Sequence, residues 1–361
     1  MNGKTSRILA LVLALMLVVA FVPGCAAEEE PVAEEEPVAE EEPVVEEPAL
    51  KTAMITDTAG LGDKSFNDLT WRGFEQAESE LGVEVEVLES ATINDYEPNL
   101  EQLAQAGYSP LVATGFLLTD TVSKVCVDYP DTMFINIDGF FEPVPANVVG
   151  VGFMENEGSY LAGVVAGLAT KDTFDDRLND KNVIGFVGGM DVPLIRKFQA
   201  GFEAGAKSVN PDVQVIGLYT GSWDDVAKGK ELGLSLIDQG ADVIYAAAGG
   251  CGEGTVRACQ EKGALFIGVD ADQYNTIANS GDVMLTSMMK NIDVVVYDLI
   301  KAAVDGDFPA GTMQVFGLKE GGVGLAPYHD FESKVPQSIK DAVQKATDAI
   351  INGTVVVPEE M

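Results

Sequence analysis

The segments Phe134-Ile-Asn-Ile-Asp138 and Phe266-Ile-Gly-Val-Asp270 decide the fold, because each reads as a short buried strand that ends in a carboxylate. Segments with a helical apolar period lie on both sides of each of them. Strands that alternate with helices in this way build parallel sheets with helices on both faces. Ligands of such proteins bind beyond the carboxyl ends of the strands, so the two aspartates mark the expected place of a site.

The same alternation runs from Lys51 towards the end of the chain. A first series of predicted strands is Thr52–Asp57, Val83–Leu88, Leu111–Thr114, Thr132–Ile137 and Val148–Val151, with helices at Asn67–Leu81, Tyr96–Ala106 and Thr119–Tyr129. After a helix at Tyr160–Ala169, a second series has strands at Val183–Val187, Val213–Tyr219, Val243–Ala247 and Leu265–Val269, with helices near Ile195–Val209, Val226–Gln239 and Thr255–Lys262. Four elements remain, at Val283–Ser287, Val294–Val304, Met313–Leu318 and Gln337–Asn352.

These elements predict an α/β protein with two doubly wound parallel-sheet lobes. The last four elements are too few for a third domain, so they must complete the first two sheets. We therefore expect a multi-crossover hinge and a cleft between the lobes. The predicted division is residues 50–155 plus about 284–312 for lobe 1, and 156–283 plus about 313–361 for lobe 2.

The loop after the first strand, Asp57-Thr-Ala-Gly-Leu-Gly-Asp-Lys-Ser-Phe-Asn-Asp68, is the first candidate for ligand contact. Its glycines allow sharp turns and close approach of the backbone. Phe66 is a large apolar ring on a polar loop, which suits stacking on a planar ligand. Alternatively, Phe66 plugs the top of its own lobe and Asn67 merely caps the next helix.

Asp138 and Asp270 suit a neutral polyol, because a carboxylate accepts hydrogen bonds from two hydroxyls. Lys290 comes twenty residues after Asp270, at the end of the next strand. We expect its ammonium to hold Asp270 ionised and to donate to a ligand oxygen. The alternative is that both acids cap turns and Lys290 is a solvated surface charge.

Two aromatic residues of the second series are further candidates. Trp223 follows a predicted strand and is expected to face Phe66 across the cleft. Phe198 either lines the same site or packs in the core with Phe202, four residues later. The glycine-rich stretch 249–254 lacks the Gly-x-Gly-x-x-Gly order of dinucleotide loops, so we interpret it as a turn that brings the backbone at Gly250 close to a ligand.

The N-terminus predicts a membrane anchor. Lys4 and Arg7 precede an apolar run, Ile8–Val22, which ends in Pro-Gly-Cys25. This resembles a bacterial lipoprotein lipobox, which implies that residues 1–24 are a signal peptide and that Cys25 becomes diacylated. Residues 25–49 form an acidic Pro/Glu repeat that cannot pack and should act as an extended tether. A plain secretory signal with an incidental cysteine is the alternative.

Composition excludes several function classes. The net charge of −36 disfavours a nucleic-acid partner. The single histidine, His329, excludes histidine-rich metal sites, and no Gly-x-Ser-x-Gly elbow is present. We therefore expect no catalytic residues, metal or cofactor. Cys126, Cys251 and Cys259 are interpreted as buried free thiols, although Cys251 and Cys259 could pair.

The chain resembles the basic membrane protein lipoproteins, substrate-binding proteins of ABC transporters that include purine nucleoside receptors. The similar motifs are Gly62-Asp-Lys-Ser-Phe-Asn67, Asp138, Gly201-Phe-Glu-Ala-Gly-Ala-Lys207, Tyr219-Thr-Gly-Ser-Trp-Asp224, Gly268-Val-Asp-Ala-Asp-Gln273 and Lys290. The resemblance implies a type I periplasmic-binding fold that closes over a nucleoside, with Phe66 and either Trp223 or Phe198 stacking on the base. It assigns the ribose to the group Asp138, Asp270 and Lys290, and the base edge to Asp57 and Asn67.

The implied protein is a non-enzymatic, monomeric binding protein on the outer face of a bacterial cell membrane. It would deliver its ligand to an ABC permease with its ATPase. Binding of another neutral solute such as a sugar, presentation of a ligand to a membrane sensor, and surface hydrolysis are the alternatives.

Overall fold

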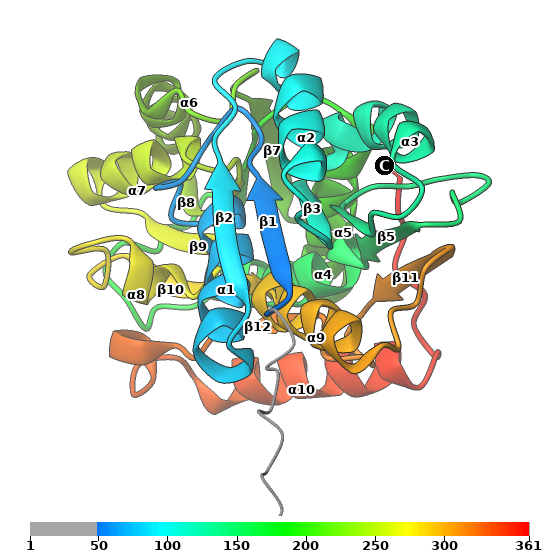
Figure 1. Cartoon of the computed structure of the whole chain (residues 1–361). Helices are drawn as coiled ribbons and strands as arrows, with labels where there is room; N and C mark the ends of the chain where they lie inside the picture. The colour runs from blue at the N-terminus through cyan, green and yellow to red at the C-terminus, as the bar shows by residue number, and fades with distance from the viewer. Residues whose placement is uncertain (1–48, 361) are drawn as a thin grey trace, which may run out of the picture. The chain divides into compact units, whose positions relative to one another are not determined.

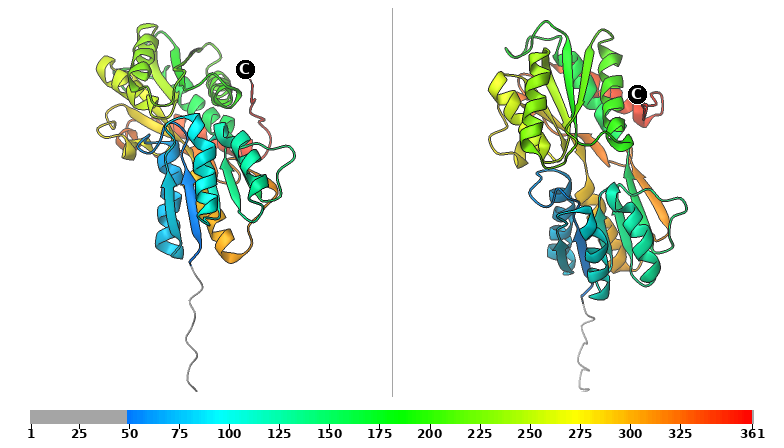
Figure 2. Two further views of the ribbon diagram at one scale, coloured as in Figure 1. Left: turned by 45° about the horizontal axis from the view of Figure 1, so that its top comes forward. Right: turned by 90° about the horizontal axis from the view of Figure 1, so that it is seen from above.

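The computed structural model describes residues 49–360. The predicted signal peptide (residues 1–24), Cys25 and the tether (25–49), apart from Ala49, lie outside the described residues. The described chain contains two six-stranded sheets with flanking helices, which confirms the predicted α/β two-lobe fold. Figure 2 shows the two halves, one built mainly from the blue-to-teal part of the chain and the other from the green-to-yellow part.

The first sheet has the strand order β11-β5-β4-β3-β1-β2, and all its pairs are parallel. Its strands are β1 (Lys51–Ile55), β2 (Glu84–Leu88), β3 (Leu111–Thr114), β4 (Phe134–Ile137), β5 (Val148–Phe153) and β11 (Thr312–Phe316). Its helices are α1 (Phe66–Leu81), α2 (Tyr96–Gln105), α3 (Thr119–Asp128) and α9 (Ile292–Asp305), of which α9 packs against α1. Every residue of β3, β4 and β5 is buried, as parallel strands covered on both faces require.

The second sheet has the order β12-β10-β9-β8-β6-β7, and only β12 is antiparallel to its neighbour. Its strands are β6 (Val183–Gly188), β7 (Gln214–Tyr219), β8 (Ala241–Ala247), β9 (Leu265–Asp270), β10 (Met284–Lys290) and β12 (Val323–Leu325). The remaining helices are α4 (Glu155–Ala169), α5 (Pro193–Val209), α6 (Val226–Asp238), α7 (Cys251–Lys262), α8 (Gln273–Thr276) and α10 (Gln337–Ile351), with α10 along the lower edge in Figure 1.

The last strands are divided between the sheets differently from the prediction. The strand predicted at Val283–Ser287 was assigned to lobe 1, but it is β10 and pairs in parallel with β9 of the second sheet. The strand predicted at Met313–Leu318 was assigned to lobe 2, but it is β11 and pairs with β5 of the first sheet. The chain therefore crosses between the sheets after β5, β10 and β11, which makes the multi-crossover hinge.

Close helix packing fixes α4 to the second lobe. Glycines of each helix face the backbone of the other: a Cβ at Gly205 would overlap the carbonyl oxygen of Tyr160, and one at Gly163 would overlap that of Phe202. The two helix backbones therefore touch. Because α4 begins two residues after β5 ends, the first crossing leads directly into this rigid pair.

The glycine-rich stretch 249–254 is only partly a turn. Helix α7 begins at Cys251, and Gly254 lies inside it, where a Cβ would overlap the carbonyl oxygen of Val226 in α6. Gly254, the last glycine of the stretch, therefore allows α6 and α7 to pack closely. Cys126, Cys251 and Cys259 are buried free thiols, so Cys251 and Cys259 are not paired.

Candidate functional site

One cavity lies where the carboxyl ends of strands from both sheets meet. Its empty volume, including the part open to solvent, is about 540 Å³. Eight of the nine predicted ligand residues line it, namely Asp57, Phe66, Asn67, Asp138, Phe198, Trp223, Asp270 and Lys290. The ninth, Gly250, is not in the lining, but its neighbour Gly249 is.

The two aspartates occupy equivalent places in the two sheets. Asp138 follows β4 and Asp270 ends β9, and each has a backbone φ of 60°. This left-handed conformation is unusual for residues other than glycine, but aspartate and asparagine tolerate it best. Both side chains are buried and line the cavity from opposite lobes.

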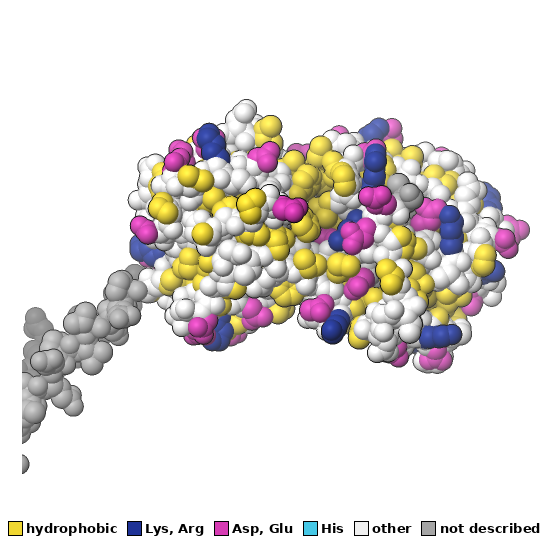
Figure 3. All heavy atoms as spheres, turned by 90° about the vertical axis from the view of Figure 1, so that its right-hand side faces the viewer, with side chains coloured by type: hydrophobic (Ala, Val, Ile, Leu, Met, Phe, Trp, Pro, Cys, Tyr) yellow, Lys and Arg dark blue, Asp and Glu magenta, His cyan; other side chains and the backbone are white. Residues whose placement is uncertain are grey.

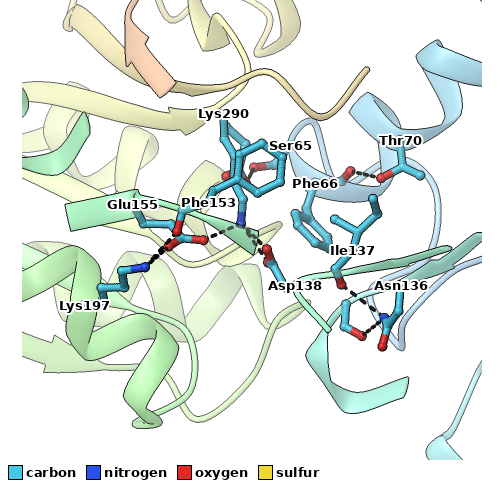
Figure 4. A network of polar contacts seen from close by, with 12 residues as sticks. Ser65, Phe66, Thr70, Asn136, Ile137, Asp138, Phe153, Glu155, Lys197 and Lys290 are labelled. Carbon is cyan, nitrogen blue, oxygen red and sulfur yellow. Dashed lines mark hydrogen bonds and ion pairs between the residues drawn. The ribbon is translucent and has the colours of Figure 1, made fainter. Parts of the chain in front are cut away.

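Lys290 lies at the centre of the polar network in Figure 4. Its Nζ is 2.8 and 2.7 Å from the two carboxylate oxygens of Asp138 and 3.1 Å from Oε1 of Glu155. The rings of Phe153 and Phe66 lie 4.9 and 5.1 Å from the ammonium, which permits cation–π attraction. The lysine is only 1 % exposed, which excludes the alternative that Lys290 is a solvated surface charge.

The ammonium of Lys290 lowers the pKa of Asp270, as expected, but its direct ion pairs are with other acids. The ion pairs of Lys290 are with Asp138 and Glu155, whereas Asp270 accepts a 2.6 Å hydrogen bond from Ser65 Oγ of the first lobe. In the β9–β10 pair, Asp270 is level with Met289, so Lys290 projects one residue further along and reaches the acid of the other lobe.

Burial makes the site acids easier to protonate. It raises the pKa of Asp57, of Asp138 and of Asp270 to about 6, although hydrogen bonds or the ammonium of Lys290 act against the rise. Burial alone lowers the pKa of Lys290, but the surrounding carboxylates outweigh it and hold the pKa above the ordinary lysine value. At pH 7 the site therefore combines ionised acids with one cation.

Asn67 orients Asp57. Its amide nitrogen donates to Asp57 Oδ1 at 2.9 Å and to Asp63 Oδ2 at 3.1 Å, and its oxygen accepts from the backbone N–H of Asp57. Both amide hydrogens are used, whereas Asp57 Oδ2 has no hydrogen-bond partner among residues 49–360. In this conformation Asp57 is thus the available acceptor, and Asn67 holds it.

The aromatic residues come from both lobes. Phe66 belongs to the first lobe, and Trp223 and Phe198 belong to the second. Phe198 both lines the cavity and belongs, with Phe202, to the buried core of the second lobe. Phe116 also lines the cavity but was not predicted; it follows β3 after a single glycine and meets Trp223 edge to face at 6.5 Å. The available signal was an aromatic residue two positions after the end of a predicted strand.

Direct contacts join the lobes beside the cavity. Besides the pair Lys290–Asp138 and the bond from Ser65 to Asp270, Thr276 Oγ1 donates to the carbonyl of Lys64 at 3.0 Å. A larger groove, of about 1,750 Å³ including the part open to solvent, adjoins the cavity and shares Phe116, Asp138 and Leu194 with it. Figure 3 shows hydrophobic side chains gathered along the waist between the two halves.

No helix in residues 49–360 has the length and apolarity needed to cross a membrane. No group of three His, Cys, Asp or Glu side chains in the same range is arranged to hold a metal ion. His329 lies outside the cavity lining, where it stacks on Tyr274 and contacts Asp272.

Two hinged α/β lobes around a cavity lined with acids, a lysine and rings are the features of a solute-binding protein. Residues 50–361 match the family model described as ABC transporter substrate-binding protein PnrA-like, and the chain belongs to this family of ABC transporter substrate-binding proteins.

Relatives and solved structures agree with this family. The chain is 35 % identical to the ABC transporter nucleoside-binding protein BmpA of Lactococcus lactis, over 86 % of this chain and 90 % of that protein. It is 38 % identical to an uncharacterized lipoprotein of Pyrococcus abyssi, over 76 % and 68 % of the two chains. A solute-binding protein of an Aeropyrum pernix ABC transporter system superposes with a TM-score of 0.77 and 28 % identity, over 86 % and 94 %.

Proposed function

We propose that this protein captures a purine nucleoside in the cleft between its lobes and delivers it to an ABC permease. The observation that carries the proposal is the meeting of aromatic rings from both lobes with Asp138, Asp270 and Lys290 in one cavity. Rings suit the faces of a base, and acids suit the hydroxyls of a sugar. The name of the Lactococcus relative, a nucleoside-binding protein, supports this ligand class.

Each predicted ligand residue has a role in the proposal. Phe66 stacks on one face of the base, and Trp223 or Phe198 contacts the other. Asp57, held by Asn67, accepts from the base edge, and the backbone near Gly250 closes the second-lobe side. Asp138, Asp270 and Lys290 bind the ribose. Contacts to both lobes favour the closed conformation, which the permease would recognise.

The proposed location is the outer face of a bacterial cell membrane. Removal of residues 1–24 and acylation of Cys25 would anchor a monomer through the tether at 25–49, and the protein would bind its ligand without turnover. The relatives named as lipoproteins support the anchor.

Calorimetric titration with nucleosides, free bases and sugars tests the proposal. We expect purine nucleosides to bind, Phe66→Ala and Asp270→Ala to weaken binding, and Val127→Ala to have no effect. Val127 is a suitable control because it is 73 % exposed on α3 and lines neither the cavity nor the adjoining groove. Tight binding of a sugar without nucleoside binding would overturn the ligand class, and release of free base during incubation would indicate an enzyme.

A further inference from the structure

Glu155 is a buried carboxylate that the proposed ligand contacts do not use. It is the first residue of α4, immediately beyond the first crossing between the sheets, and it is 0 % exposed. Neither of its oxygens accepts a hydrogen bond from the described residues. Its charged neighbours are the ammonium groups of Lys290, 3.1 Å from Oε1, and Lys197, 3.0 Å from Oε2.

These groups form a row of alternating charge, Lys197–Glu155–Lys290–Asp138, which Figure 4 shows from end to end. Lys197, on α5, also donates to the carbonyl of Phe153 at 2.7 Å. Asp138 is 4 % exposed, and its two oxygens both face Lys290. The row therefore runs through the protein interior from the second lobe to the first.

Only one link of this row spans the two lobes. Lys197 lies on α5, Glu155 on α4 and Lys290 on β10, and these three elements pack together in the second lobe. Asp138 follows β4 of the first lobe. Separation of the lobes would therefore break the pair Lys290–Asp138 and leave the pairs Lys197–Glu155 and Glu155–Lys290 intact within the second lobe.

We infer that Glu155 is a positioning residue that holds the Lys290 ammonium at the cleft in both the open and the closed conformation. This inference rests on the proposed function. Lysine has a long flexible stem. Without Glu155, the ammonium of Lys290 would move with Asp138 of the first lobe or turn to Asp270, the remaining acid of its own lobe. With Glu155 in place, the stem is ordered at folding rather than at binding, so a ligand oxygen meets a preplaced donor.

The test is a double-mutant cycle in the full-length protein with Glu155→Gln, Lys290→Met and both changes together. Binding of inosine and of its free base, hypoxanthine, is measured by calorimetry. Since truncating one partner of a buried charge pair is costly, Glu155→Gln should weaken inosine binding about tenfold or more. Hypoxanthine binding should change much less, because the base does not contact Lys290. In the Lys290→Met background, Glu155→Gln should have little further effect.

Several controls keep the outcome interpretable. Glu203→Gln changes an exposed ion pair with Lys207 on α5 and should leave binding unchanged. If Glu155→Gln fails to fold, Glu155→Gln with Lys197→Met removes the buried pair as a unit, a change that proteins often tolerate. This double variant should show the same selective loss for inosine.

The inference is overturned if Glu155→Gln binds inosine as the wild type does, or loses inosine and hypoxanthine equally, or shows the same loss in the Lys290→Met background. A wild-type protein that binds no nucleoside would instead reject the proposed function. In that case the same cycle is measured by urea unfolding of the unliganded protein. Non-additive effects at positions 155 and 290 support the coupling, and additive effects reject it.

Discussion

Asp270→Asn is expected to stabilise the unliganded protein at pH 7. The carboxylate of Asp270 is buried, and Ser65 is its only hydrogen-bond donor among residues 49–360. Burial raises its pKa to about 6, from about 3.9 in an unfolded chain. Asparagine has the same shape, carries no charge, can accept the same bond from Ser65 and tolerates the left-handed backbone at this position.

The size of the effect follows from the shift in pKa. The difference is about two pKa units, and one unit corresponds to about 1.4 kcal/mol, so the ionised Asp270 lowers the free energy of unfolding by about 3 kcal/mol at pH 7. The folded state binds the proton more tightly than the unfolded state. Stability from this group is therefore complete below about pH 4 and is lost as the pH rises through about 6.

Urea unfolding, followed by the fluorescence of Trp71 and Trp223, measures this effect at pH 4.5 and pH 7. The variant should exceed the wild type at pH 7 and approach it at pH 4.5, while its nucleoside binding falls. A variant that is less stable than the wild type at pH 7, or whose advantage is the same at both pH values, would refute the reasoning. The expected result would mean that the site is maintained at the expense of stability.

Phe66→Ala should weaken nucleoside binding about ten- to hundredfold in calorimetry, because stacking contributes about 1–3 kcal/mol per base, and an unchanged affinity would contradict the stacking role. Gly205→Ala should lower the free energy of unfolding by about 1–3 kcal/mol or more, because its Cβ would overlap the Tyr160 carbonyl. Gly324→Ala, with open space around it, should leave the free energy of unfolding unchanged. Equal stability of the two variants in urea would argue against the close α4–α5 packing. Cys25→Ser should move the protein from the membrane fraction to the soluble fraction, and retention in the membrane would disprove the lipid anchor.

Local patterns predicted the elements of this fold well but not all their partners. The strand predicted at Leu111–Thr114 has the same bounds as β3, because a short apolar run between turn signals is a local property. The sheets of β10 and β11 were exchanged in the prediction. Both are short strands, and the choice of sheet depends on pairing with β9 and β5, which no local period encodes.

Local sequence patterns likewise predicted some residues of the site but not those whose role depends on burial. The positions of Asp138 and Asp270 were predictable, because the end of an apolar strand run locates the edge of a parallel sheet. Glu155 and Lys197 were missed, because nothing in the sequence indicates that a charged side chain is buried. The predicted helix also began at Tyr160, which left Glu155 in a loop, whereas α4 begins at Glu155 itself.

A crystal structure of the protein grown with inosine tests the central claim most directly. The account predicts the base between Phe66 and a ring of the second lobe, with the ribose hydroxyls within hydrogen-bond distance of Asp138 and Asp270. A cleft that stays filled by its own side chains, with inosine absent or bound elsewhere, would contradict it.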